Sequence, residues 1–175
     1  MAKYAKKYSK SYNENYHKFS SDCTNFASQC VYAGGKRMDG VSPKMIPRIG
    51  GKTVSDSKKW YYLNGKGRSN YICTTSWVRC SGKNAFNNYW NSYRVGTYKD
   101  LKNVRSSASV GDVIQIVLSD GTLKHSIIVT KKDKGDSEIY CSSHTSDYYN
   151  DSLASISRRA NKSWGKVKYA IFHFS

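Results

Sequence analysis

Apolar side chains in the first third of the chain follow a helical period. In the stretch SSDCTNFASQCVYAGG, residues 20–35, they recur on one face: Cys23, Phe26, Ala27, Cys30 and Val31. Serine and aspartate, which cap helices well, precede this stripe, and a glycine pair, which ends helices well, follows it. The pattern therefore predicts a helix that begins at Cys23, with Asp22 as its cap and Cys30 in the core.

An earlier stripe consists of tyrosines that lie four residues apart: Tyr4, Tyr8, Tyr12 and Tyr16. This spacing predicts a helix over about residues 3–16 that packs its tyrosine face on the rest of the domain. Residues 36–70 are polar and rich in glycine, which indicates loops with short elements. Residues 83–92 fit either a further helix or a loop that shapes a groove, and the sequence leaves both open.

The last third of the chain is typical of a β-sheet. β-branched and aromatic side chains gather in residues 113–119, 125–132, 138–145 and 166–175. The Asp120–Gly121 pair and the run at 133–136 favour tight turns, and short turns predict antiparallel neighbours. We therefore expect an α+β fold in which N-terminal helices pack on a C-terminal antiparallel sheet, with residues 1–175 as one domain.

The formal net charge of +17 is large for 175 residues and indicates an acidic partner or environment. Nucleic acid and a phosphate-rich bacterial wall both meet this description. The chain has no RNP pattern, no zinc-finger spacing and no helix with clustered arginines, so we do not expect nucleic-acid binding. The tryptophans Trp60, Trp77 and Trp90 suit either an aromatic core or a glycan groove, with core the expectation for at least two of them.

The five cysteines leave at least one thiol outside any intrachain pair. No two of them have the CxxC spacing of a zinc site, and we predict neither a metal nor another cofactor. A small disulfide loop between Cys73 and Cys80 stays open. No segment is apolar enough to span a membrane, and the basic N-terminal segment lacks the apolar core of a secretory signal.

Cys23 has the position of a nucleophile. Unpaired N–H groups and the dipole at a helix start favour a thiolate, which lowers the pKa of a thiol there. His125 opens a predicted strand after a tight turn, so its imidazole could take the thiol proton. The next predicted strand ends in Cys-Ser-Ser-His, residues 141–144, from which a neighbour could orient the imidazole. This order permits thiolate attack on an amide carbonyl, with the Cys23 N–H as a donor to the oxyanion.

Several motifs resemble those of the bacterial putative amidase domain, a family related to the NlpC/P60 cysteine peptidases and, more remotely, to papain. They are DCTNFASQC followed by GG, then GDVIQI, HSIIVT and SSHTSDYYNDSL. The resemblance extends over nearly the whole chain, and DCTNF is its most specific block. It implies a papain-like fold and hydrolysis of an amide bond in bacterial peptidoglycan. Either the sugar-to-alanine amide or an amide of the stem peptide or cross-bridge suits the same thiol.

The resemblance also implies roles for individual residues. Cys23 is the nucleophile, His125 is the base and His144 is the third member of the triad. Ser142 and Asp147 are the alternatives for that third place, because related families differ there.

Supporting roles are expected for residues around the nucleophile. Asp22 is expected to cap the helix rather than to act as an acid. Asn25 either bonds near the site or faces solvent. Tyr16 packs in the helix seam or, as in some relatives, assists the oxyanion.

The expected protein is a monomer that acts at the bacterial cell wall on peptidoglycan, attracted by anionic wall polymers. A phage lysin released through a pore, or a piece of an exported protein, would need no signal of its own. Two rival functions stay open. One is a non-catalytic basic module that binds wall or nucleic acid, and the other is a papain-like protease or toxin that acts on protein.

Overall fold

The computed structural model describes residues 1–145 and 148–174 of the chain. The helices are α1 (Ala2–Tyr8), α2 (Cys23–Ala33), α3 (Thr75–Val78), α4 (Phe86–Tyr89), α5 (Leu101–Ser107) and α6 (Leu153–Trp164). The strands are β1 (Gly51–Val54), β2 (Tyr62–Asn64), β3 (Tyr71–Thr74), β4 (Arg94–Tyr98), β5 (Val113–Val117), β6 (Leu123–Lys132), β7 (Ile139–Ser143), β8 (Tyr148–Ser152) and β9 (Lys168–Phe172). Short 3₁₀ turns lie at Pro43–Met45, Asn91–Tyr93 and Lys134–Asp136. The predicted α+β class is confirmed.

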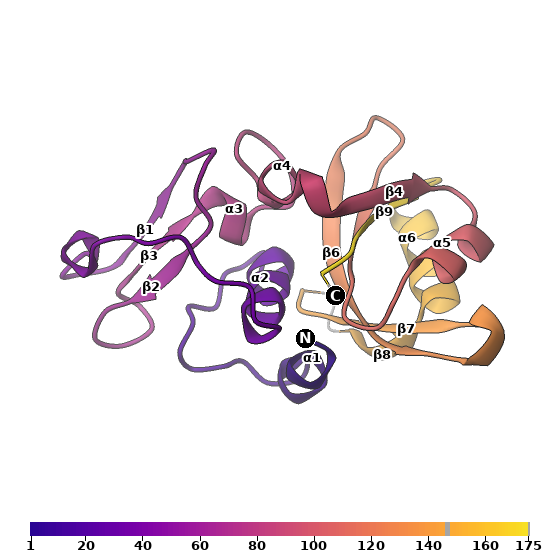
Figure 1. The fold of residues 1–175 in the computed structure, drawn as a ribbon, viewed down its shortest axis with the longest axis horizontal. Coiled ribbons are helices and arrows are strands. Elements are labelled where there is room, and N and C mark those ends of the chain that lie inside the picture. The colour runs from indigo at the N-terminus through magenta and orange to yellow at the C-terminus, as the bar shows by residue number, and fades with distance from the viewer. Residues whose placement is uncertain (146–147, 175) are drawn as a thin grey trace.

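The strands of the described residues form a large and a small sheet. The large sheet has the order β4-β9-β5-β6-β7-β8 and is antiparallel throughout. The small sheet has the order β1-β3-β2 and combines one parallel with one antiparallel pair. Figure 1 shows the small sheet at one end of the molecule and the large sheet at the other, with α2 between them. The predicted meander is confirmed for β5, β6 and β7, whereas the last predicted strand, β9, pairs with β5 and not with β7.

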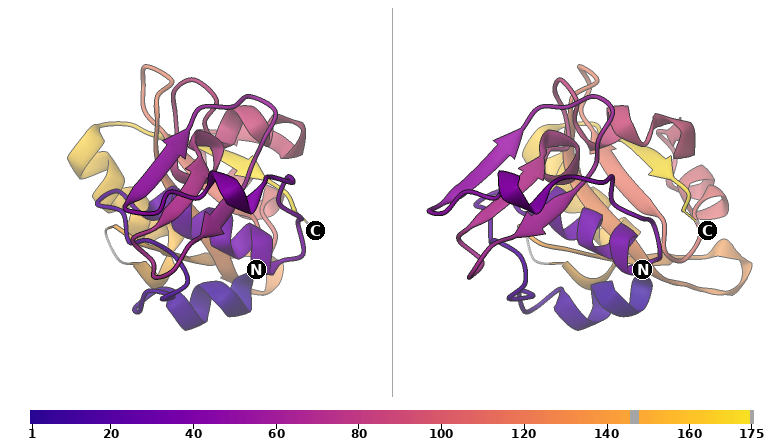
Figure 2. Two further views of the ribbon diagram at one scale, coloured as in Figure 1. Left: turned by 90° about the vertical axis from the view of Figure 1, so that its left-hand side faces the viewer. Right: turned by 60° about the vertical axis from the view of Figure 1, so that its left-hand side comes forward.

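Helices cover both faces of the large sheet. Side chains alternate along a strand, so Val113 and Val117 of β5 pack with α2, whereas Ile114 and Ile116 pack with α6. In the left view of Figure 2, α2 lies in front of the large sheet and α6 lies behind it. Every residue of β5 is consequently buried.

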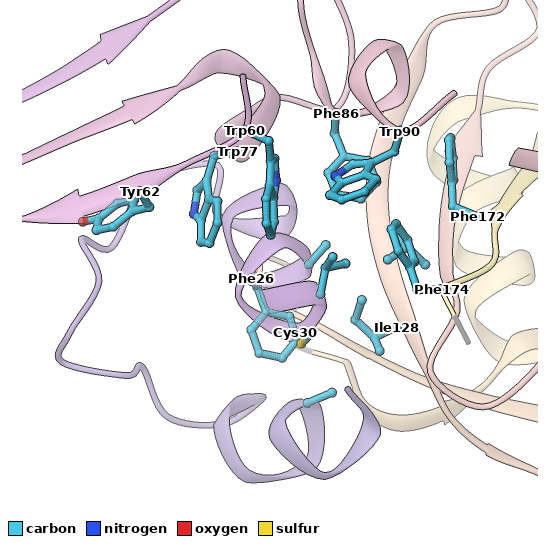
Figure 3. Close-up of a cluster of buried hydrophobic side chains, with 14 of the residues drawn as sticks. Phe26, Cys30, Trp60, Tyr62, Trp77, Phe86, Trp90, Ile128, Phe172 and Phe174 are labelled. Atoms are coloured by element: carbon cyan, nitrogen blue, oxygen red, sulfur yellow. The ribbon is translucent and has the colours of Figure 1, made fainter. Parts of the chain in front are cut away.

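The two faces carry different cores. The core on the α2 side, called the aromatic core below, includes Phe26, Cys30, Trp60, Tyr62, Trp77, Phe86, Trp90, Ile128, Phe172 and Phe174 (Figure 3). The core on the α6 side, called the aliphatic core, includes Val104, Ile114, Ile116, Ile127, Val129, Ile139, Leu153, Ile156 and Ile171. The three candidate tryptophans are buried in the aromatic core, so the expectation of core packing is confirmed for all of them.

The predicted helix over residues 3–16 is wrong in its second half, because α1 ends at Tyr8. Polar side chains beyond that point bond to the backbone. Ser11 Oγ donates to a carbonyl of the last helical turn, and Asn13 Oδ1 accepts from the Asn15 N–H at 3.0 Å. Such local bonds compete with helical ones, and the tyrosines that follow pack as single rings.

Other segments differ from the prediction in extent. Residues 83–92, for which the sequence left a helix and a loop open, contain the short helix α4 and the start of a 3₁₀ turn. Phe86 and Trp90 of this segment pack in the aromatic core. The elements β4, α5, β8 and α6 were not predicted from the pattern. Within the residues that the structure describes, no helix has the length and apolar character needed to cross a membrane.

Candidate active site

The start of α2 is held by groups from outside the helix. The Phe26 N–H donates to the Asp22 carbonyl at 2.9 Å, so the N–H groups before it have no acceptor within the helix. Asp22 occupies the cap position, but its carboxylate makes no cap hydrogen bond to α2, which corrects the predicted role. Asp22 Oδ1 instead accepts from the Phe19 N–H and from Asn25 Nδ2, both at 2.9 Å.

Cys23 is the first residue of α2 and lies at the floor of a cleft with a volume of about 290 Å³. Three segments line this cleft: the start of α2, the loop that follows α3, and the start of β6 with the turn before it. They contribute Thr24, Cys80 and Lys124, respectively. The Cys23 residue is 7% exposed, so most of its surface is shielded while the cleft gives access to it.

Neighbouring groups lower the pKa of the Cys23 thiol well below its ordinary value. The largest effect is a hydrogen bond from Cys80, and burial opposes it. A hydrogen bond and the positive charge of His125, and the N–H of Ser126, lower the pKa further. The pKa of Cys80 is raised by its hydrogen bond with Cys23 and by burial. The thiolate belongs to Cys23, because a helix start and an imidazole favour negative charge there.

His125 reaches Cys23 from the third position of β6, opposite Ile116 of β5. Its side chain is buried and meets the Tyr148 ring edge-on, with 5.6 Å between the ring centroids. The Trp164 ring lies at 6.4 Å. Among the described residues, no group is hydrogen-bonded to Nε2 of His125. Among the described residues, the rings of Tyr148 and Trp164 therefore hold the imidazole in place by packing.

His144 does not lie where the predicted triad requires it. Its Nδ1 is 2.6 Å from Asp22 Oδ2, and its Nε2 is 2.6 Å from the Tyr8 carbonyl oxygen. The ring also stacks on Phe26, with 4.0 Å between centroids. Both partners are acceptors, so the two bonds together require a proton on each ring nitrogen. His144 thus joins α1 to the start of α2, and neither of its nitrogens is available to orient His125.

The buried pair of Asp22 and His144 also affects the nucleophile next to it. A lone carboxylate beside Cys23 would disfavour a thiolate by repulsion between like charges. The imidazolium compensates the carboxylate at 2.6 Å, and both side chains are at most 1% exposed. The pair therefore fixes the start of α2 and adds little net charge to the cleft.

The remaining residues that were predicted to support the site make hydrogen bonds within the fold. Asn25 Nδ2 donates to the His17 carbonyl at 3.0 Å, and its Oδ1 accepts from Trp77 Nε1 at 2.9 Å, so it is buried instead of facing solvent. Ser142 Oγ accepts from the Asn150 N–H at 3.0 Å.

Tyr16 lies with the aromatic core, where its ring faces Tyr62 and Trp77, and burial raises its pKa to about 12. The ring packs on the core as expected, but from a loop and not from a helix seam, because α1 ends at Tyr8. Asp147 lies outside the described residues.

Comparison with known proteins assigns the chain to a family. Residues 1–168 match the family described as "Putative amidase domain". The chain belongs to this amidase family. "Uncharacterized protein YhbB" of Bacillus subtilis (strain 168) is 30% identical over 178 residues, which cover 98% of this chain and 48% of the relative. The chain therefore spans about half the length of that relative. No solved structure matches, so the predicted likeness to the papain-like NlpC/P60 fold stays a prediction.

The amidase cleft contains a polar cluster that the sequence did not indicate. Thr24 Oγ1 donates to Cys80 Sγ at 3.1 Å and lies 3.1 Å from Ser126 Oγ, which is itself 3.0 Å from Cys80 Sγ. Gln115 Nε2 donates to Ser126 Oγ at 3.1 Å. These residues come from α2, β5, β6 and the loop after α3, so only the fold brings them together. Two of them, Thr24 and Ser126, directly follow the predicted Cys23 and His125 in the sequence.

Two cations line the amidase cleft, Arg79 and Lys124, together with the hydroxyls of Ser21 and Thr122. The described residues that line the cleft include no carboxylate. Within residues 1–145 and 148–174, no group of three or more His, Cys, Asp or Glu side chains is arranged to hold a metal ion. The absence of a cofactor stays a prediction.

Proposed function

We propose that this amidase domain is a cysteine-dependent hydrolase of bacterial peptidoglycan. The observation that carries the proposal is Cys23 at the first turn of α2, beside His125, with a lowered pKa and access to the cleft. A lowered pKa increases the share of thiolate, which is the nucleophile that amide hydrolysis needs. The order of a nucleophile on a helix and a base on an antiparallel strand also supports a papain-like NlpC/P60 mechanism.

The proposed reaction begins with attack of the Cys23 thiolate on the carbonyl carbon of the amide. The developing oxyanion accepts a hydrogen bond from the Cys23 N–H, which has no acceptor within α2. His125 gives a proton to the leaving amine, and a thioester with Cys23 forms as the C–N bond breaks. His125 then takes a proton from water, whose attack on the thioester releases the carboxylate and restores the thiolate.

The charge of the domain supports an anionic substrate. Peptidoglycan stem peptides carry free carboxylates, and wall polymers carry phosphates. Arg79 and Lys124 at the cleft offer partners for such groups, and the net charge of +17 favours attraction to an anionic wall. This charge supports the proposal that the domain acts at the bacterial cell wall.

The decisive experiment is a digest of purified Gram-positive peptidoglycan with fragments read by mass spectrometry. The wild type is compared with Cys23→Ala and with Cys30→Ala, which removes a thiol from the core face of the same helix. We expect new amine and carboxyl ends with the wild type and Cys30→Ala but not with Cys23→Ala. The fragment masses identify the bond, either the sugar-to-alanine amide or a peptide amide.

Three other outcomes would contradict the proposal. Equal digestion by Cys23→Ala would exclude the thiol mechanism. Binding of wall by all folded variants without any cleavage would favour a binding module instead, and cleavage of a denatured protein but not of wall would favour a protease. A parallel digest with EDTA should match the untreated one, and a loss of activity that zinc restores would overturn the expectation that no metal is needed.

A further inference from the structure

Cys80 is the feature of the cleft that amide hydrolysis does not explain. A hydrolase with Cys23 and His125 needs one thiol, but a second thiol lines the same cleft. The two are bridged by Thr24, whose Oγ1 is 3.8 Å from Cys23 Sγ and 3.1 Å from Cys80 Sγ. Cys80 also has the largest single effect on the pKa of the Cys23 thiol, which it lowers. The two sulfur atoms are therefore close neighbours.

The other cysteines have different surroundings. Cys30, Cys73 and Cys141 are fully buried, and none of them lines the cleft. Cys73 meets Thr53 Oγ1 at 3.6 Å in the small sheet, so the disulfide with Cys80 that the sequence left open is not formed. The described residues include all five cysteines, and each is a free thiol.

We propose that Cys23 and Cys80 form a reversible disulfide when the protein meets a peroxide, and that this bond is a protective modification site in the cleft. Cys80 is partly exposed and lies in the loop that joins α3 to α4, where no regular element restricts the backbone. The loop can therefore adjust to the geometry of a disulfide. Both α2 and the core thiols keep their positions.

The chemistry follows from the unequal thiols. The Cys23 thiolate attacks one oxygen of hydrogen peroxide, the O–O bond breaks, and hydroxide leaves, which forms a sulfenic acid on Cys23. The Cys80 sulfur then attacks the Cys23 sulfur, the S–O bond breaks, and a disulfide forms. The two leaving hydroxides take up the two thiol protons as water. The thiols lose two electrons and the peroxide gains them.

The consequence for activity rests on the proposed function. A disulfide removes the nucleophile, so hydrolysis stops until a reductant restores both thiols. Without Cys80 the sulfenic acid would be open to further peroxide and to irreversible oxidation. With Cys80 present, loss of the nucleophile is therefore reversible, and without Cys80 it becomes irreversible.

The test treats the folded protein with a molar excess of hydrogen peroxide, enough to carry an unprotected thiol past the sulfenic acid, then alkylates the remaining thiols and digests it with trypsin without a reductant. Cleavage after lysine and arginine places Cys80 in the peptide of residues 80–83, and Cys23 and Cys30 together in residues 19–36. We expect these two peptides to be joined, with a mass lower by two hydrogens. The same bond should form in Cys30→Ala, which assigns it to Cys23, and it should disappear with dithiothreitol.

The matched variant is Cys80→Ser, which keeps a small polar side chain in the loop. It should gain oxygen at Cys23 under the same treatment, without recovery in dithiothreitol. A treated wild type with alkylated Cys80 and a sulfinic acid on Cys23 would overturn the proposal. A joined peptide that contains Cys73 or Cys141 would also overturn it. This readout is independent of hydrolysis, so the disulfide and the proposed function fail or stand separately.

Discussion

Helices α2 and α6 pack on opposite faces of one sheet but bury different kinds of side chain. In α6 the buried residues form a single stripe, which consists of Leu153, Ile156, Ser157 and Ala160. In α2 nine of eleven residues are buried, and polar side chains are among them. Amphipathic burial accounts for α6 completely. The buried polar groups of α2 have a cost that packing alone does not explain.

Each buried polar residue of α2 has a specific partner. Asn25 accepts from Trp77, Ser28 donates to the Trp77 carbonyl at 2.8 Å, and Gln29 accepts from the Tyr4 hydroxyl at 2.7 Å. These bonds fix the helix against the aromatic core on several sides. They hold the N-terminal turn, and with it Cys23, in one orientation toward β6. The comparison indicates that the buried residues of α2 fix the position of Cys23, whereas those of α6 cover the sheet.

The largest effect that would sharpen this comparison is expected for the base. His125→Gln should lower the rate of wall hydrolysis by about 10³–10⁴-fold, because the thiol proton and the leaving amine lose their partner. Ser157→Ala, in the buried stripe of α6, should leave the rate within a factor of about two. The measurement is the initial rate on soluble peptidoglycan fragments at fixed pH. A similar loss in both variants would mean that the imidazole beside the start of α2 matters no more for hydrolysis than the packing of α6 on the sheet.

The next effect concerns stability. Asp22→Asn should lower the free energy of unfolding by about 3–5 kcal/mol, because it leaves the buried imidazole of His144 without its carboxylate. One amide oxygen also cannot serve the Phe19 N–H, Asn25 Nδ2 and His144 at once.

The matched change at α6 is Asp151→Asn, which breaks the exposed pair with Arg159. It should cost within about 0.5 kcal/mol. Urea unfolding followed by tryptophan fluorescence measures both free energies. Equal costs would refute the view that the start of α2 depends on a buried ion pair.

A smaller effect is expected in the pH profile of Cys23. Its lowered pKa means that the thiolate is present above that value and is lost as the pH falls through it. Alkylation by iodoacetamide should therefore reach its plateau at a lower pH than for an ordinary thiol with a pKa of about 8.5.

Cys80→Ala removes the hydrogen bond that lowers this pKa most, so the plateau should move to higher pH. A shift of about one unit would lower the rate about tenfold on the acidic side. Cys80→Ser retains a donor and should lie between the two profiles. Coinciding profiles of wild type and Cys80→Ala would show that Cys80 has no influence on the thiolate.

The contrast between the two helices also explains what the sequence could predict. The apolar stripe and flanking residues located α2 and its first residue, because both are local signals. The β-branched runs located β5, β6, β7 and β9 for the same reason. The imidazole of His125 could be matched to Cys23 because a short turn fixes where β6 starts.

Long-range contacts left no such signal. The pairing of His144 with Asp22 joins residues 122 positions apart, whereas the strand order predicts only that some residue at the end of β7 lies beside His125. Cys80 approaches Cys23 only because α3 and the loop after it pack on α2, and neither has a strong periodic pattern. The tyrosine stripe led to a wrong prediction although it is a local signal. Its helical spacing continues to Tyr16, but polar side chains after Tyr8 bond to the backbone and end α1 there.

The smallest effect tests whether charge acts at the cleft or over the whole surface. Arg79→Gln, at the cleft, should lower kcat/KM for wall fragments by about two- to fivefold at low salt. Arg158→Gln removes the same charge from the exposed face of α6 and should have less than half that effect. Both differences should shrink as sodium chloride rises, since salt at 0.1 M largely screens exposed charges that are more than about 10 Å apart. Equal losses in the two variants would assign the attraction to net charge alone, and Arg79 would then have no part in choosing the substrate.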